Sequence, residues 1–180
     1  LLLAASATLL LASSIYVVHV TEAEVVEVDT FLYLMVAPNP AGVGQTVLIT
    51  FQLDKPSPLA FGVLEKIPGS FFRGFTIKIT KPDGTVETKG PLKAWATSGA
   101  FIFYTPDQEG TYRIQASFPG QWINTTAFAV GGWRPNTQYW FKPSVSREVE
   151  LIVQSQPPEP YPEVPLPTDY WTRPIYGENK

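Results

Sequence analysis

Hydrophobic residues recur at every second position in the central part of this chain, and this spacing constrains the fold more than any other feature. Between Gln45 and Asp54 the apolar members of the alternation are Val47, Ile49, Phe51 and Leu53. Because successive side chains of a β-strand point to opposite faces of a sheet, this period of two predicts a strand with one buried face. Helical periodicity does not appear beyond the apolar N-terminal segment.

The same pattern predicts about seven short strands. Turn residues such as Pro82-Asp83-Gly84 separate them, because proline presets φ and glycine accepts positive φ. The predicted strands cover residues 31–36, 45–54, 72–80, 85–88, 101–103, 112–118 and 148–153, with Phe101 and Phe103 marking the fifth. Seven short strands with one apolar face each favour an all-β fold, an antiparallel β-sandwich.

Composition excludes several classes of function. The chain has no cysteine, which excludes disulfides and thiolate metal sites and leaves burial to stabilise the fold. Residues 24–154 carry equal numbers of acidic and basic side chains, and the whole chain has a net charge of −3. Without a basic surface, we expect no nucleic-acid partner.

One local motif narrows the type of sandwich. Asp107, Gly110 and Tyr112 form the pattern Asp-x-x-Gly-x-Tyr immediately before a predicted strand. This pattern resembles the tyrosine corner of immunoglobulin-like (Ig-like) sandwiches, in which the tyrosine hydroxyl bonds to the backbone of the preceding loop. Ile114 stands where antibody domains have a cysteine, and Trp95 is the candidate for the buried tryptophan of such domains.

The N-terminal segment predicts export. Leu1 to Val20 is uncharged when His19 is neutral, and Thr21-Glu22-Ala23 offers small residues for cleavage after Ala23. Residues 1–23 are therefore a signal peptide or an uncleaved membrane anchor formed by an apolar helix. Either alternative predicts an extracellular or cell-surface location, with the membrane contacted only through residues 1–20 if these are retained.

The C-terminal segment, residues 155–180, predicts a linker. It is rich in proline between Pro157 and Pro174, which favours an extended polyproline rod that leads into the start of a following domain. Residues 162–179, PEVPLPTDYWTRPIYGEN, resemble the junction in large archaeal secreted or surface proteins. In these proteins an Ig-like domain precedes a β-propeller of the pyrroloquinoline-quinone-binding-like type. The resemblance implies a signal, an Ig-like domain at 24–154 and a linker, and it carries no quinone site.

Candidate catalytic groups are few. His19 is the only histidine and lies in the apolar N-terminal segment, so a histidine triad or multi-histidine metal site cannot form. Asp107 and Glu109 are expected to form a turn rather than a calcium site, and no Gly-x-Ser-x-Gly elbow occurs. We expect no enzyme activity, no metal and no cofactor.

A long segment from Phe118 to Val145 separates the last two predicted strands. It is either a hairpin of its own or a functional loop. Its candidate ligand or interdomain contacts are Trp122, Trp133, Tyr139 and Trp140, and Asn124 begins an N-glycosylation sequon, Asn-Thr-Thr. The aromatic rings either pack over the sandwich edge, dock on a neighbouring domain, or bind an external ligand.

Three hypotheses for function follow. The first is a non-enzymatic, extracytoplasmic Ig-like module that presents or spaces a downstream β-propeller and mediates surface or interdomain contacts. The second is a carbohydrate-binding accessory module of a secreted enzyme, and the third is a surface filament or S-layer subunit. The corresponding partners are the downstream domain of the same chain, surface glycans and other surface proteins.

Overall fold

The computed structural model describes residues 24–59, 70–125, 129–160, 162, 163 and 165 of the chain, and these residues form strands without any helix. No stretch within them could cross a membrane as a helix. The strands, in chain order, are β1 (Glu24–Val28), β2 (Leu32–Ala37), β3 (Ala41–Gly42), β4 (Val47–Leu53), β5 (Arg73–Thr80), β6 (Val86–Lys93), β7 (Gly99–Tyr104), β8 (Gly110–Phe118), β9 (Gln121–Asn124), β10 (Thr137–Phe141), β11 (Ser144–Val145) and β12 (Val149–Gln154).

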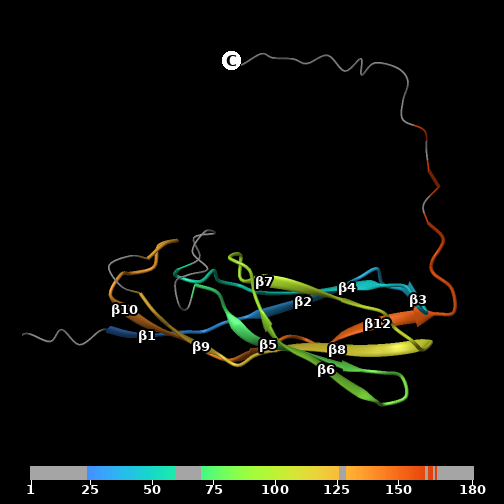
Figure 1. The fold of residues 1–180 in the computed structure, drawn as a ribbon, viewed down its shortest axis with the longest axis horizontal. Helices are drawn as coiled ribbons and strands as arrows, with labels where there is room; N and C mark the ends of the chain where they lie inside the picture. The colour runs from blue at the N-terminus through green and yellow to red at the C-terminus, as the bar shows by residue number, and fades with distance from the viewer. Residues whose placement is uncertain (1–23, 60–69, 126–128, 161, 164, 166–180) are drawn as a thin grey trace, which may run out of the picture.

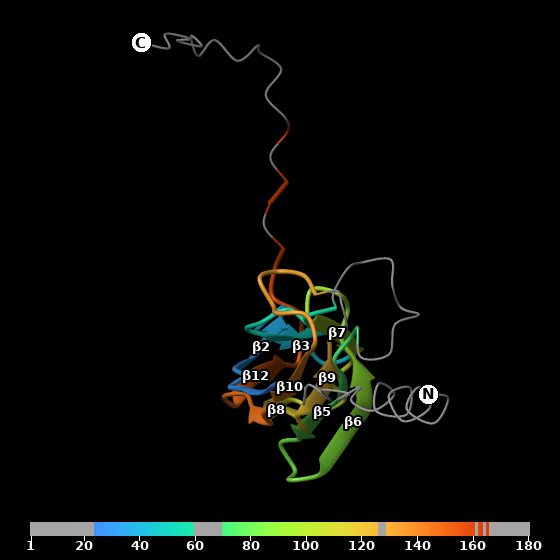
Figure 2. The ribbon, with the colours of Figure 1, turned by 90° about the vertical axis from the view of Figure 1, so that its left-hand side faces the viewer.

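Two sheets pack face to face as a sandwich. One has the strand order β2-β4-β7, and the other has the order β3-β12-β8-β5-β6, with β11 paired to β8. Figure 2 shows the two layers end-on, with β2 and β7 in one layer and β5, β6 and β8 in the other. The alternation over 45–54 and 72–80 determines which side chains lie between the layers.

The core is one continuous apolar cluster between these sheets. Phe51 of β4 contacts Phe75 of β5 with ring centroids 5.0 Å apart, and Tyr104 of β7 contacts Tyr112 of β8 at 6.0 Å. The predicted inward residues of β4, β5 and β8 are buried: Val47, Ile49, Phe51, Leu53, Phe75, Ile77, Ile79, Tyr112, Ile114, Ala116 and Phe118. Their face assignment is confirmed.

A third sheet, with the order β1-β10-β9, extends one end of the sandwich (Figure 1). β9 and β10 form an antiparallel hairpin, and β1 joins β10 in parallel. The segment between the last two predicted strands therefore forms a hairpin of its own. The chain leaves the opposite end of the molecule after β12 (Figure 1).

The strand prediction was right for all seven strands, which correspond to β2, β4, β5, β6, β7, β8 and β12. The described residues contain five further strands, β1, β3, β9, β10 and β11. The expectation of a purely antiparallel sandwich was wrong, because β1 pairs with β10, and β3 with β12, in parallel.

Two side-chain assignments also need correction. Phe101 and Phe103, which marked the fifth predicted strand, would form its apolar face in a sandwich with one buried face per strand. The buried residues of β7 are instead Ala100 and Tyr104, whereas Phe101 and Phe103 point to solvent and are 49% and 70% exposed. Trp95 is 65% exposed, so it is not a buried core tryptophan. It lies in the turn after β6, where its amide bonds to the Gly99 carbonyl, so the backbone there holds it at the surface.

The two terminal predictions lie mostly outside the described residues. The apolar segment of residues 1–23 and residues 166–180 are among those the structure does not describe. The described residues of the proline-rich segment, 155–160, 162, 163 and 165, are exposed and join no sheet.

Candidate functional site

The third sheet places the four aromatic candidates on two opposite faces. Neighbouring residues of a strand alternate between faces, and β9 and β10 are paired so that Trp122 lies opposite Trp140 and Ile123 opposite Tyr139. Trp122 and Trp140 therefore share one face, while Tyr139 shares the other with the buried Ile123. Pairing between the strands separates the candidates into an outer and an inner group.

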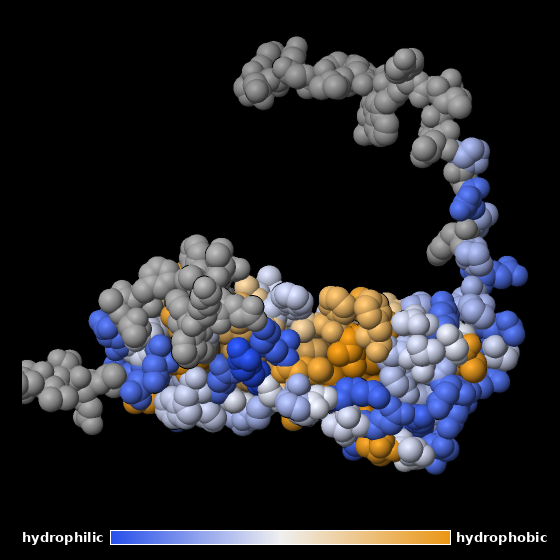
Figure 3. Space-filling view, viewed as in Figure 1, coloured by the Kyte–Doolittle hydropathy of each residue, from blue (hydrophilic) through white to orange (hydrophobic). Residues whose placement is uncertain are grey.

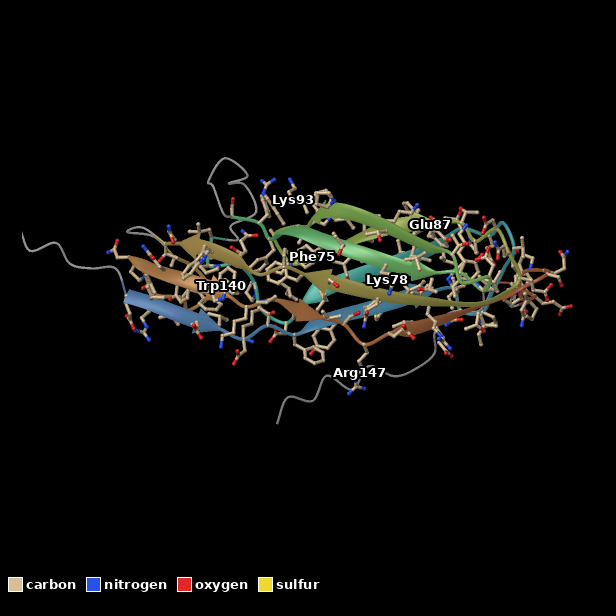
Figure 4. The ribbon with its side chains drawn as sticks, turned by 90° about the horizontal axis from the view of Figure 1, so that it is seen from below. Phe75, Lys78, Glu87, Lys93, Trp140 and Arg147 are labelled. Carbon is tan, nitrogen blue, oxygen red and sulfur yellow. The ribbon has the colours of Figure 1, made fainter. Side chains whose placement is uncertain are left out.

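The outer group is a pair of tryptophans in contact. The ring centroids of Trp122 and Trp140 lie 5.1 Å apart with an interplanar angle of 34°. Trp122 is 52% exposed, and Trp140 is half-buried beneath it. Gly120 allows this packing, since a Cβ there would come within 2.9 Å of the Trp140 ring. We call Trp122 and Trp140 the tryptophan pair; Figure 4 shows Trp140 at the end of the molecule away from Glu87.

The inner group belongs to the core. Tyr139 is 3% exposed, and its hydroxyl accepts a hydrogen bond from the Arg134 amide at 2.8 Å. Trp133 packs edge-on against Tyr139 and Phe141, with centroids 4.9 and 5.4 Å apart. Tyr139 therefore has no ring face open to solvent, while Trp133 is partly buried against the core. Both rings help to hold the hairpin against the sandwich, and their role as ligand or interdomain contacts stays a prediction.

Polar side chains surround the tryptophan pair. Asn124 is exposed on β9, two residues after Trp122 and therefore on the same face, and it pairs in register with Gln138. Glu27 of β1 pairs in register with Trp140. Amide and carboxylate groups beside an exposed ring can hydrogen-bond the hydroxyls of a sugar that stacks on the ring.

Charges at the rim of this face are paired. Lys142 lies 3.0 Å from the carboxylates of both Glu27 and Asp29. The hydrogen bonds that Lys142 donates to Glu27 and then to Asp29 raise the pKa of Lys142. Arg134 bonds both carboxylate oxygens of Glu24 at 2.8 Å, which ties β1 to the loop before β10. These pairs tie β1 to the two ends of β10 beside the tryptophan pair, and the charged side chains stay largely exposed.

The residues of the predicted tyrosine corner lie at the other end of the sandwich. Tyr112 is fully buried, and its hydroxyl accepts a hydrogen bond from the Gln108 amide at 2.9 Å. The same hydroxyl donates to the Asp107 carboxylate at 3.0 Å. Gly110 has φ +130° and a Cβ there would meet Pro82 at 2.9 Å, so both conformation and space require glycine.

An ion-pair cluster joins this corner to the edge of the larger sheet. Lys81 lies 2.8 Å from both Asp107 and Glu87. Hydrogen bonds to Asp107 and then to Glu87 raise the pKa of Lys81, and the same bonds lower the pKa values of both carboxyl groups. Burial, followed by the charge of Glu87, raises the pKa of Tyr104 to about 12. Through Lys81, the cluster links Asp107 in the loop before β8 to Glu87 of β6 at the edge of the larger sheet. Within the described residues, no three His, Cys, Asp or Glu side chains are placed to hold a metal ion.

A second exposed surface was not predicted from the sequence. The outer face of β2-β4-β7 carries large apolar side chains, and Figure 3 shows apolar residues gathered on the flank of the molecule there. We call this surface the aromatic face; its most exposed members are Phe31, Tyr33, Met35, Phe101 and Phe103. A hollow of 330 Å³ at its margin is lined by Phe31, Leu32, Tyr33, Leu34 and Arg147.

The fold and these surfaces define an all-β sandwich domain with an exposed tryptophan pair at one end. No known protein family matches the sequence, and no curated protein matches it. Among solved structures, the chain is similar to the solution NMR structure of the CARDB domain of a Pyrococcus furiosus protein, at 15% identity. The similarity covers 71% of this chain and 97% of that domain, with a TM-score of 0.33. Because the TM-score is so low, function has to be inferred from the surfaces themselves.

Proposed function

We propose that this chain is a non-enzymatic, extracytoplasmic Ig-like module that spaces a downstream β-propeller and mediates surface or interdomain contacts. The observation that carries the proposal is the placement of its two ends. Strands β9 and β10, which carry the tryptophan pair, lie at one end of an elongated sandwich, and the proline-rich linker leaves from the other (Figure 1). Such a module holds a contact surface away from the domain to which it is tethered.

The start of the linker is fixed to the sandwich. Val153, the last core residue of β12, pairs with Ala41 of β3, and the Val43 amide bonds to the Gln154 carbonyl at 2.8 Å. Gly42 packs directly under the linker, since a Cβ there would lie 2.8 Å from the Gln156 carbonyl carbon and closer still to Pro157. The linker therefore starts in a fixed direction, and proline residues keep it extended.

Export can be tested with the full chain behind its own N-terminal segment in a secreting host. We expect the released protein to begin at Glu24, as read by N-terminal sequencing, or a retained protein to be cut by protease added to whole cells. Accumulation of protease-protected, uncleaved chain in the cytoplasm would contradict the proposal. Hydrolytic or redox turnover by the purified chain would contradict its non-enzymatic part.

Carbohydrate binding is a second candidate, favoured by one specific observation. Trp122 presents an exposed ring, and Asn124 and Gln138 lie in the next row of the same face with amide groups that can donate and accept hydrogen bonds. Sugar rings stack on aromatic faces in this manner, because their C–H groups are attracted to the π-system. The same surface would then select glycans of a cell envelope or an insoluble polysaccharide.

The test for this candidate compares three tryptophan variants on a glycan array and on cellulose and chitin. Trp122→Ala and Trp140→Ala should each reduce the bound fraction several-fold. Trp95→Ala is the matched control, because Trp95 is 65% exposed but lies outside the tryptophan pair. Equal losses in all three variants, or no binding by the unmodified chain to any of these probes, would reject carbohydrate binding and leave protein contact as the role of the pair.

A further inference from the structure

The aromatic face extends across three paired strands. β4 lies at its centre, paired on one side with β2 and on the other with β7. Met35, Thr50 and Phe101 form the middle row, because Thr50 pairs with both of the others. The rows on either side are Ala37, Leu48 and Phe103, and Tyr33, Gln52 and Gly99. Ring contacts hold its aromatic groups, with Phe101 and Phe103 centroids 5.5 Å apart.

The exposed apolar area is large for a module of this size. The five most exposed side chains are between 49% and 70% exposed: Phe31, Tyr33, Met35, Phe101 and Phe103. Large side chains of this kind offer about 150–250 Å² each, so together they expose roughly 430–720 Å². This range overlaps the upper part of the size of the largest apolar patch on a typical monomer, about 300–600 Å², and extends beyond it.

Charge is missing from this face, unlike the outer face of the opposite sheet. None of the nine outward positions in the three described rows is Asp, Glu, Lys or Arg. The opposite sheet carries Lys78, Arg113 and Glu150 at its outward positions, with Arg113 3.9 Å from Glu150. A charge-free face does not select a charged partner, and it does not repel a copy of itself.

We propose that the aromatic face is the interface of a homodimer, in which two copies pack β2-β4-β7 against each other around a two-fold axis. Two such faces would bury up to about 900–1,400 Å², which lies near the lower limit for a specific interface. The dimer is therefore reversible rather than obligate. In this arrangement the central strand β4 faces its own copy, and both the tryptophan pair and the linker stay outside the interface.

The chain offers a clean crosslinking test, because it contains no cysteine. Thr50→Cys places a single thiol in the middle row of β4, and Gln115→Cys places one at an equally half-buried position of β8 on the opposite sheet. Packed sheets lie about 10 Å apart, so a bismaleimide of that span is the suitable reagent. We expect the full chain with Thr50→Cys to crosslink several-fold more than with Gln115→Cys. Equal yields would overturn the proposal, because association through any other segment affects both variants alike.

A second measurement uses Met35, which is the single methionine of the chain and lies in the middle row. Its ¹³C-labelled methyl group gives one NMR signal, which should shift with protein concentration if copies associate through this face. Phe103→Ser should abolish the shift, whereas Ile152→Ser, at a 50% exposed position of β12, should preserve it. A signal that does not depend on concentration would overturn the proposal and assign the face to another occupant, such as the domain after the linker.

Discussion

Removal of the Tyr112 hydroxyl tests whether the tyrosine corner contributes to stability. Tyr112→Phe keeps the ring, which packs against Tyr104 in the core, and removes one oxygen. That oxygen accepts the hydrogen bond of the Gln108 amide at 2.9 Å and donates to Asp107 at 3.0 Å. The substitution therefore leaves the packing intact and takes away two hydrogen bonds at the loop before β8.

The expected loss follows from what remains after the substitution. The Gln108 amide is partly buried and loses its hydroxyl partner, which costs about 1–1.5 kcal/mol. Loss of the hydrogen bond to Asp107 adds little to this cost, because the Asp107 side chain is 59% exposed and keeps its ion pair with Lys81 at 2.8 Å. The free energy of unfolding should therefore fall by about 1–1.5 kcal/mol.

Urea unfolding followed by tryptophan fluorescence measures this difference. With a slope of about 1–3 kcal/mol per M, the midpoint should fall by roughly 0.3–1.5 M at unchanged slope. Tyr33→Phe is the control, because Tyr33 is 52% exposed and should show no measurable change. Coincident curves for Tyr112→Phe and the unmodified chain would refute the reasoning, because the hydroxyl bonds would then contribute nothing net.

Two further predictions concern the core and the ion-pair cluster. Ile77→Ala should lower the free energy of unfolding by about 2–5 kcal/mol, because it opens a cavity in the core. The control Ile152→Ala should change the free energy of unfolding by less than about 0.5 kcal/mol. If Ile77→Ala leaves the stability unchanged in the same urea assay, the face assignment is wrong. Asp107 and Glu87 have lowered pKa values in the folded state, so their contribution is complete above the ordinary carboxyl pKa and is lost as the pH falls through the lowered values. The free energy of unfolding should thus be constant between neutral pH and about 5 and should decrease below about pH 4. Lys81→Met should make this decrease smaller when unfolding is measured across the acid range. An unchanged pH profile in that variant would mean that Lys81 does not set those pKa values.

The strands whose two faces differ in polarity were predictable from the sequence. In β4 and β5, threonine, glutamine and lysine alternate with apolar residues, so the pattern identifies both the strand and its buried face. β7 is different, because Ala100, Phe101, Ile102, Phe103 and Tyr104 are all apolar or aromatic. Such a run predicts a strand but cannot indicate which face is buried, and the larger phenylalanine rings are the ones left outside.

The candidate site depends on pairing between distant strands, which a single sequence does not reveal. The hydrogen bonds of the Tyr112 hydroxyl fall within the six residues from Asp107 to Tyr112, so a short motif could indicate them. The tryptophan pair requires the register of β9 against β10, and Ile123 and Tyr139 beside it are equally hydrophobic. The aromatic face requires the order β2-β4-β7, which places Met35 near Phe101 although 66 positions separate them in the chain.

The two terminal strands also determine how the domain would respond to mechanical load. β1 starts at one end of the molecule and β12 finishes at the other, each lying lengthwise against its neighbours (Figure 1). Ladder hydrogen bonds run across the strands, so a force that pulls Glu24 and Gln154 apart strains all the bonds of a terminal strand together, in shear. Peeling from the side would break them one at a time. A domain with this geometry withstands tension along its long axis, the direction in which its linker would transmit a pull.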